Sequence, residues 1–204
     1  MQVSNLRQYS QGEFKLVGRK EPVLHQPAQP VDSLDPSLSQ VLDQMNDCMR
    51  REGGVGLAAP QIGIPYRLMV INTGDGPHKL ANPTITERSG HQLSLEGCLS
   101  LGGTMSVVMR SSRVKVDAID DHGRPTTVEC KGFKACAFQH EIDHLDGKLM
   151  TDRALVNINT KKVLGAAAGA LIGGALRGLP GAALGGAVGV AVGVGLVWAG
   201  EKIF

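Results

Sequence analysis

A chain of 204 residues with a net charge of +2 is long enough for one ordinary domain and an appendage. The net charge argues neither for nor against nucleic acid, but an aromatic content of 3% argues against a stacking platform, so no direct nucleic-acid binding is expected. The N-terminus is polar and lacks the apolar run of a signal peptide. We therefore expect a reducing, cytoplasmic environment in which the four cysteines do not form disulfides.

The N-terminal part of the chain is expected to lead into a helix. Residues 1–14 are polar and predicted to be poorly ordered, and prolines punctuate residues 20–31, which favours an extended segment. Asp35-Pro36 is typical of a helix N-cap followed by proline in the first turn. Apolar residues recur at helical spacing from Leu38 to Met49, and Gly53-Gly54 is expected to end this helix, with Gly54 as its cap.

The middle of the chain is predicted to consist of strands and turns before a second helix. Residues 67–71 form an apolar strand, residues 113–118 alternate as a half-buried strand does, and residues 126–130 return after a turn. The second helix is predicted from Phe133 to Leu145. Residues 1–162 are thus expected to be one α+β domain, with antiparallel β-sheets packed around a central metal-binding helix.

The second helix contains the sequence His140-Glu141-Ile142-Asp143-His144. Histidines four residues apart lie on one helix face and can bind one metal ion, and the neighbouring glutamate can move protons of a water on that ion. No histidine follows His144, and the only later glutamate, Glu201, lies in a glycine-rich tail, so the third ligand is expected upstream. Cys98 is the best candidate, because Cys/His/His with a fourth position for water is a recognised catalytic arrangement. A buried structural or disulfide-bonded cysteine is the alternative for this position.

Three motifs occur along the chain in a characteristic order. They are Gly54-Val55-Gly56-Leu57-Ala58-Ala59-Pro60-Gln61, Glu96-Gly97-Cys98-Leu99-Ser100 and Gln139-His140-Glu141-Ile142-Asp143-His144. Together they resemble the peptide deformylases, metal-dependent hydrolases that remove the N-formyl group from newly made polypeptides. The resemblance covers roughly residues 15 to 155. It implies formylated nascent peptides as substrates and one divalent ion, Fe²⁺ in the cell or Zn²⁺, although the donors also suit Ni²⁺ or Co²⁺.

The resemblance also implies catalytic roles. Glu141 would take a proton from the attacking water and deliver it to the departing amine. The side-chain amide of Gln61 and the backbone N–H of Leu99 would donate hydrogen bonds to the oxygen that becomes negatively charged.

A pocket for the methionine side chain of the substrate is expected beside His140. The resemblance places Val55 and the helix residues Phe133, Cys136 and Ala137 in its wall, and Gly56 where the substrate backbone comes close. Helical spacing alone fits an ordinary apolar core equally well for the three helix residues, so both alternatives stay open.

One segment departs from the family pattern. Leu101-Gly102-Gly103 follows Cys98-Leu99-Ser100, where the family usually has a proline, and two glycines loosen this segment. Substrate preference beyond the first residue is therefore not carried over. The remaining histidines belong to no motif and are expected at the surface, at positions His25, His78, His91 and His122.

Residues 163–204 are expected to be a separate Gly/Ala-rich hydrophobic C-terminal tail, helical in its favoured form. Arg177 is the only charge between Val163 and Gly200, and glycines recur every four residues, as in GxxxG helix contacts. Residues 178–200 are long enough to span a bilayer. A membrane or glycine-zipper hairpin, helices packed in a protein assembly, and disorder or β-aggregation stay open as alternatives.

The tail bears on partners and on competing functions. Bacterial deformylases usually end in a polar, charged helix that helps contact the ribosome, so ribosome docking is not carried over to this apolar tail. The tail instead predicts membrane association or self-association, and a membrane-inserting protein with the metal domain as cargo is one alternative function. The other is a metal-dependent amidase or peptidase acting on a different N-acyl substrate.

Overall fold

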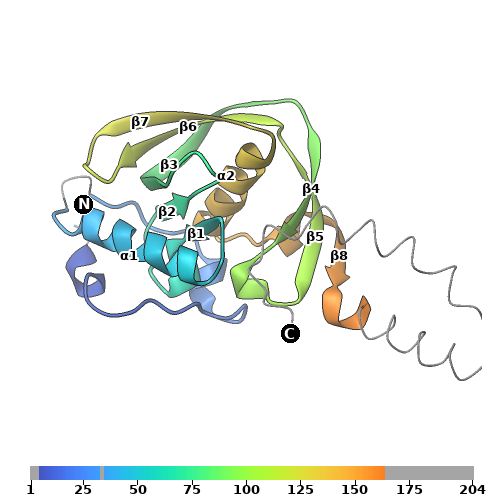
Figure 1. Ribbon diagram of the computed structural model, residues 1–204, viewed down its shortest axis with the longest axis horizontal. Helices are drawn as coiled ribbons and strands as arrows, with labels where there is room; N and C mark the ends of the chain where they lie inside the picture. The colour runs from blue at the N-terminus through green and yellow to red at the C-terminus, as the bar shows by residue number, and fades with distance from the viewer. Residues whose placement is uncertain (1–4, 33–34, 164–204) are drawn as a thin grey trace, which may run out of the picture.

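The computed structural model describes residues 5–32 and 35–163, which form two antiparallel β-sheets and two long helices (Figure 1). This architecture confirms the predicted α+β class with antiparallel sheets. The predicted tail falls almost entirely on residues 164–204, outside the described residues, so its helical hairpin, its membrane association and its self-association stay predictions. Among the described helices, none combines the length and the apolar character needed to cross a bilayer.

The larger sheet has five strands in the spatial order β1-β2-β3-β6-β7, and each neighbouring pair is antiparallel. Its strands are β1 (Gly56–Ala58), β2 (Leu68–Ile71), β3 (His78–Ser89), β6 (Arg113–Asp120) and β7 (Pro125–Lys131). The strands predicted at residues 67–71, 113–118 and 126–130 are therefore confirmed as β2, β6 and β7, with small shifts at their ends.

The smaller sheet has three strands in the order β4-β5-β8, again antiparallel. Its strands are β4 (Gln92–Gly97), β5 (Thr104–Arg110) and β8 (Ala154–Asn159). The remaining short elements are one α-helical turn and four 3₁₀ turns: α3 (Met150–Arg153), η1 (Leu6–Tyr9), η2 (Pro22–His25), η3 (Ala59–Ile62) and η4 (Leu99–Leu101).

Helix α1 (Leu38–Arg51) lies against the five-stranded sheet, and its apolar stripe is buried as predicted. Its beginning and end differ from the sequence expectation. The Asp35 carboxylate accepts a hydrogen bond from the Ser37 N–H in the turn before the helix, which itself begins at Leu38. Gly53, with φ +69°, takes the left-handed position after the helix, so the cap predicted at Gly54 lies one residue earlier.

Helix α2 (Gly132–Leu145) lies between the two sheets and contacts both (Figure 1). Every residue from Ala135 to Leu145 is buried, including five polar ones. Strand β2 shows why the helix fits there: Leu68 and Val70 belong to the core on the α1 side, whereas Met69 and Ile71 belong to the core on the α2 side. A strand covered on both faces has an unbroken apolar sequence.

The expectation of poor order in residues 1–14 is wrong for the described part of that segment. Leu6 begins η1, is fully buried in the core beside α1, and its N–H donates to the Asp35 carboxylate at 3.1 Å. A single leucine in a polar stretch carries little periodic signal, so its burial depends on a surface that α1 and its neighbours supply. Similarly, the expected extended segment at residues 20–31 contains the 3₁₀ turn η2.

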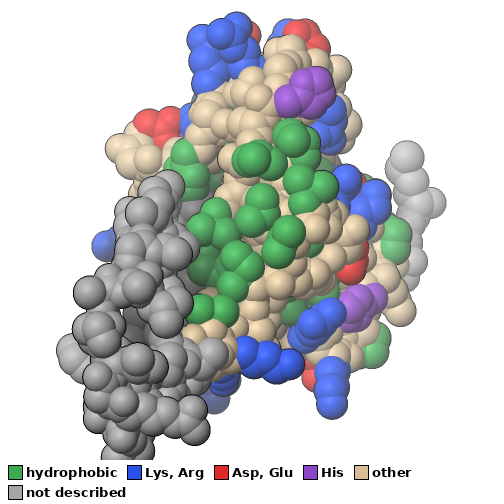
Figure 2. Space-filling view, turned by 90° about the vertical axis from the view of Figure 1, so that its right-hand side faces the viewer, with side chains coloured by type: hydrophobic (Ala, Val, Ile, Leu, Met, Phe, Trp, Pro, Cys, Tyr) green, Lys and Arg blue, Asp and Glu red, His purple; other side chains and the backbone are tan. Residues whose placement is uncertain are grey.

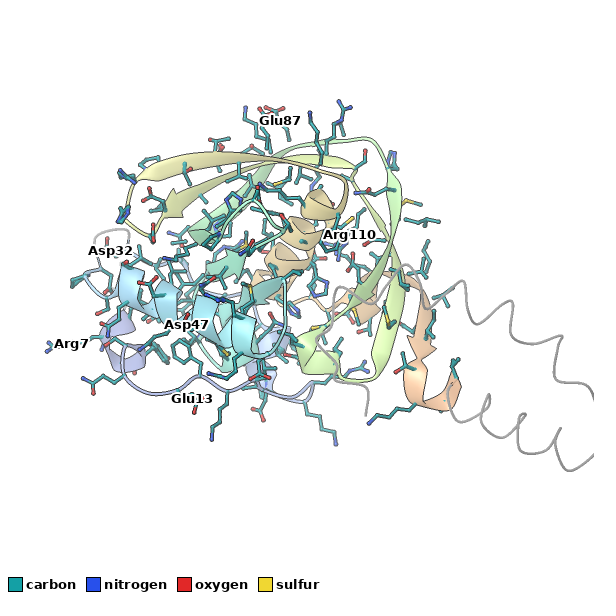
Figure 3. The ribbon with its side chains drawn as sticks, viewed as in Figure 1. Arg7, Glu13, Asp32, Asp47, Glu87 and Arg110 are labelled. Atoms are coloured by element: carbon teal, nitrogen blue, oxygen red, sulfur yellow. The ribbon has the colours of Figure 1, made fainter. Side chains whose placement is uncertain are left out.

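We expect Leu6→Ala to destabilise the domain by about 2–5 kcal/mol, the usual cost of truncating a fully buried leucine. Urea unfolding of the full chain measures this change. Arg7→Ala is the matched control, because Arg7 is exposed and points away from the domain in Figure 3, and it should stay within about 0.5 kcal/mol. Equal free energies of unfolding for both variants would show that η1 does not contribute to the core.

Candidate active site

The candidate metal ligands come from two elements that meet at the centre of the domain. His140 and His144 lie one turn apart on α2, and Cys98 follows the last residue of β4 directly. The Cys98 Sγ lies 3.2 Å from the His144 Nε2, and the two imidazole rings are 5.0 Å apart. One donor atom from each of the three residues lies within 4.8 Å of the others, and all three side chains are buried.

These three residues fit a metal ion by donor chemistry and by their charges. One thiol and two imidazoles are donors for a borderline-soft divalent cation, and they leave a coordination position open. Burial acts to lower the pKa of His140, but its hydrogen bonds with Cys98 and Glu96 raise that pKa to about 10. The pKa of His144 is lowered instead, by burial and by the charge on His140, so this imidazole stays neutral, the form in which histidine binds a metal.

An ionic network surrounds His140. The Glu96 Oε2 accepts a hydrogen bond from the His140 Nδ1 at 2.9 Å, and the same carboxylate binds the Arg110 guanidinium through two hydrogen bonds of 2.8 Å. Arg110 also contacts the Asp143 carboxylate on α2. Figure 3 shows Arg110 inside the domain beside α2. A carboxylate on the far nitrogen of a ligating histidine fixes its tautomer and its ring orientation.

The network keeps its members charged in spite of their burial. Burial would raise the pKa of Glu96, but the hydrogen bonds from Arg110 and His140 lower it to about 2. Burial would likewise lower the pKa of Arg110, and Glu96 and Asp143 raise it above its ordinary range. Glu96 and Asp143 stand in the motifs quoted above without an assigned role, and the sequence around Arg110 gave no signal of its role.

The Glu141 side chain lies against Gly56 on β1. Its Oε2 is buried and has no hydrogen-bond partner among the described residues. Burial raises the pKa of its carboxyl to about 7, which matches what a general base or acid needs near neutral pH. A Cβ on Gly56 would lie 2.3 Å from the Glu141 Oε1, so glycine at this position leaves room for the carboxylate. Gly56 was expected to face the substrate, and the structure places it against Glu141.

Gln61 and Leu99 both adjoin Cys98, Gln61 through its side chain and Leu99 as the next residue in the chain. The Gln61 side chain is buried, its Oε1 accepts from the Ala58 N–H at 2.8 Å, and its Nε2 lies 3.6 Å from the Cys98 Sγ. Because the Oε1 accepts the Ala58 N–H, the NH₂ side of the Gln61 amide points at Cys98. Leu99 begins η4 directly after Cys98, and its side chain packs against Gly54.

The residues expected in the methionine pocket separate into two groups. Val55 is half-buried, Phe133 is exposed on the first turn of α2, and the Cys136 Sγ accepts a hydrogen bond from the Gln92 side chain at 3.0 Å. Ala137 is fully buried in the core between α2 and the five-stranded sheet. The core alternative therefore applies to Ala137, and Cys136 is also buried, whereas Val55 is half-buried and Phe133 is exposed.

The Gly102-Gly103 segment lies at the site. A cavity of about 190 Å³ is lined by Cys98, Leu99 and these two glycines, together with Thr160 at the end of β8. Of the histidines expected at the surface, His25, His91 and His122 are exposed. His78 is half-buried instead, with its ring 5.6 Å from that of Phe138 and its Nε2 2.9 Å from the Lys134 Nζ.

Comparison with known proteins agrees with this geometry. Residues 14–161 match the family model of polypeptide deformylases. The chain belongs to the polypeptide deformylase family. It is a metal-dependent hydrolase that removes the N-formyl group from newly made peptides, as the three motifs implied. The matched range stops short of residues 164–204.

Individual relatives show how far the similarity extends. The chain is 47% identical over 141 residues to peptide deformylase 1 of Bacillus subtilis, covering 68% of this chain and 88% of the relative. It is 41% identical over 141 residues to the peptide deformylase of Pelotomaculum thermopropionicum, covering 69% and 91%. The crystal structure of the Thermotoga maritima deformylase superposes with a TM-score of 0.69 at 37% identity, covering 72% of this chain and all of that one.

We expect Glu96→Gln to lower metal affinity or kcat/KM by about 10- to 100-fold, because the charge that orients His140 and neutralises Arg110 is lost. Metal content after dialysis and kcat/KM on a formyl-methionyl peptide measure the effect. Glu87→Gln is the matched control, since Glu87 pairs with Lys115 at the surface and is far from the network in Figure 3. Wild-type metal content and activity in Glu96→Gln would contradict the role given to this carboxylate.

We expect Gly56→Ala to lower kcat by about 100-fold, because the added methyl group displaces the Glu141 carboxylate. Metal content should stay at the wild-type level, since no ligand moves. Gly18→Ala is the control, because nothing lies within 4 Å of a Cβ at that position. An unchanged kcat in Gly56→Ala would show that the position of Glu141 is not limiting.

Proposed function

We propose that Cys98, His140 and His144 bind the single divalent ion on which deformylation depends. The short distances between their donor atoms, their burial and the carboxylate behind His140 support this assignment. When bound, the ion would act as a Lewis acid toward the formyl oxygen and would lower the pKa of water, so that water can lose a proton near neutral pH. Fe²⁺ is the ion that the family resemblance favours in the cell, and Zn²⁺, Ni²⁺ and Co²⁺ suit the same donors.

Glu141 is the proton carrier in this proposal. Its Oε2 has no partner among the described residues and is free to accept a proton from the attacking water. The same carboxyl then gives that proton to the nitrogen of the departing amine as the C–N bond breaks. Its pKa of about 7 suits both steps, because burial makes loss and gain of the proton nearly equal in free energy.

Gln61 and Leu99 are the proposed donors to the oxygen of the formyl group. The Ala58 N–H occupies the Gln61 Oε1, so the Nε2 of the same amide points at the cluster as a donor. Leu99 is the first residue after Cys98, which places its backbone N–H next to the ligand. Fixed donors stabilise the charge that develops on this oxygen without reorganisation.

The methionine side chain of the substrate is proposed to lie along α2 beside His140. Val55, Phe133 and Cys136 supply the wall, and Ala137 stands behind them in the core. Gly56 contributes through the space it leaves for Glu141 and through the backbone of β1. Formylated nascent peptides as substrates are consistent with the cytoplasmic location expected from the reduced cysteines.

The decisive experiment has two parts. It measures kcat of the Gln61→Glu variant on a formyl-methionyl peptide, and it compares turnover of formyl-methionyl and acetyl-methionyl peptides by the wild-type chain. This variant keeps an oxygen to accept from the Ala58 N–H and removes the amide donor. We expect kcat on the formyl peptide to fall about 100- to 1000-fold with metal content retained. The wild-type chain should hydrolyse the acetyl peptide far more slowly. Equal turnover of the two peptides would favour the alternative of a general N-acyl amidase, and an unchanged kcat in Gln61→Glu would remove Gln61 from the mechanism.

A further inference from the structure

The outer face of the three-stranded sheet is apolar along its whole length. Side chains alternate across a strand, so residues paired in register share a face. Leu93 pairs with Met109, Leu95 with Val107, Val107 with Val156, and Met105 with Ile158. The outward side chains are therefore all apolar: Leu93, Leu95, Met105, Val107, Met109, Val156 and Ile158.

The other face of the same sheet behaves quite differently. Its side chains include Ser106, Val108 and Arg110, which are buried against α2 and α3. On the outward face, Leu93 is 65%, Val156 55% and Met109 47% exposed. Figure 2 shows hydrophobic side chains gathered on this side of the molecule. Single exposed apolar residues are ordinary, but a continuous face on three strands marks a surface that another apolar segment covers.

The chain leaves this sheet at one end of that face. The Thr160 N–H and the Thr160 Oγ1 both donate to the Gly103 carbonyl at 3.0 Å, beside Met105. Thr160 follows β8 directly, and Val163, the last described residue, is 43% exposed. Residues 164–204 therefore begin within a few residues of the apolar face.

The sequence of residues 164–200 matches the face in chemistry. It consists almost entirely of Gly, Ala, Val and Leu, with Arg177 as its one charge. Three strands about 4.8 Å apart and roughly six residues long make a surface of about 10 by 20 Å. A helix of about 14 residues covers that surface, and small side chains let it approach a sheet closely. The segment is long enough to do so and begins where the face ends.

We propose that residues 164–200 dock on the outer face of β4, β5 and β8 of their own chain. Tethering at Thr160 makes this contact intramolecular, which favours it over contact with a second molecule. The docked segment would remove Leu93, Met109 and Val156 from water. It would also lie next to the Gly102-Gly103 segment, because Met105 and Gly103 adjoin the same end of the face.

Photo-cross-linking of the full chain tests this proposal directly. Leu93→Cys is labelled with a benzophenone maleimide, which is selective because the four native cysteines are buried. Irradiation and tryptic mass spectrometry should then find adducts in the peptides 163–177 or 178–202, which cleavage after Lys162, Arg177 and Lys202 delimits. Thr84→Cys on β3 is the matched control, exposed on the other sheet, and should give no such adduct.

Mixing the labelled chain with an isotopically heavy, unlabelled chain identifies the source of the segment. Adducts only to the light segment, at a yield independent of protein concentration, support the proposal. Adducts to the heavy chain that increase with concentration would overturn it in favour of a second copy. Adducts formed only after anionic phospholipid vesicles are added, adducts to lipid itself, or no adducts at Leu93 would overturn it as well.

A charged residue introduced on the apolar face distinguishes docking of residues 164–200 from their chance proximity to the label. In the labelled chain, Val156→Asp should lower the adduct yield about tenfold or more, because docking would then bury an unpaired carboxylate. Thr84→Asp should leave the yield unchanged. Deformylation of a formyl-methionyl peptide by every variant verifies the fold, since Val156 and Thr84 lie outside the active site. Equal adduct yields in the two aspartate variants would contradict the proposal.

Discussion

The buried ionic network around Arg110 is the interaction on which the geometry of the domain depends. Arg110 on β5 binds Glu96 on β4 through two hydrogen bonds and contacts Asp143 on α2. It therefore connects both hairpin strands of the smaller sheet to the central helix. Removing one partner of such a buried network typically costs about 3–5 kcal/mol, because the other charge stays buried without compensation. The three elements consequently have one favourable register.

That register is also what brings the candidate metal donors together. Cys98 stands two residues after Glu96, and the two histidines stand on either side of Asp143 in sequence, at positions 140 and 144. When Arg110 joins Glu96 to Asp143, the thiol arrives at the face of α2 that carries both imidazoles. Glu96 then serves twice, since the same carboxylate also accepts from His140. The same charges of Glu96, Arg110 and Asp143 thus stabilise the fold and orient His140.

The sequence predicts the chemistry of the site better than the surroundings that support it. His140 and His144 were predicted as ligands from their helical spacing and Cys98 as the best upstream candidate, because metal binding restricts residue type and spacing severely. Arg110 ends a strand of mixed sequence, and nothing local distinguishes a buried arginine from an exposed one. Its role depends on Glu96 and Asp143, which lie 14 and 33 residues away. The same reasoning applies to Leu6, whose burial depends on α1.

The strands predicted from the sequence became β2, β6 and β7, whereas β4 and β5 were missed although each has one apolar face. β6 alternates clearly, whereas β4 and β5 place Glu96, Ser106 and Arg110 on their inner face and apolar side chains on the outer one. This inversion has a physical cause, because the inner face must carry the charges that meet α2. The apolar side chains on the outer face of this sheet then require another segment to shield them from water. The charged inner face that meets α2 and the apolar outer face of the sheet are therefore two consequences of the same arrangement.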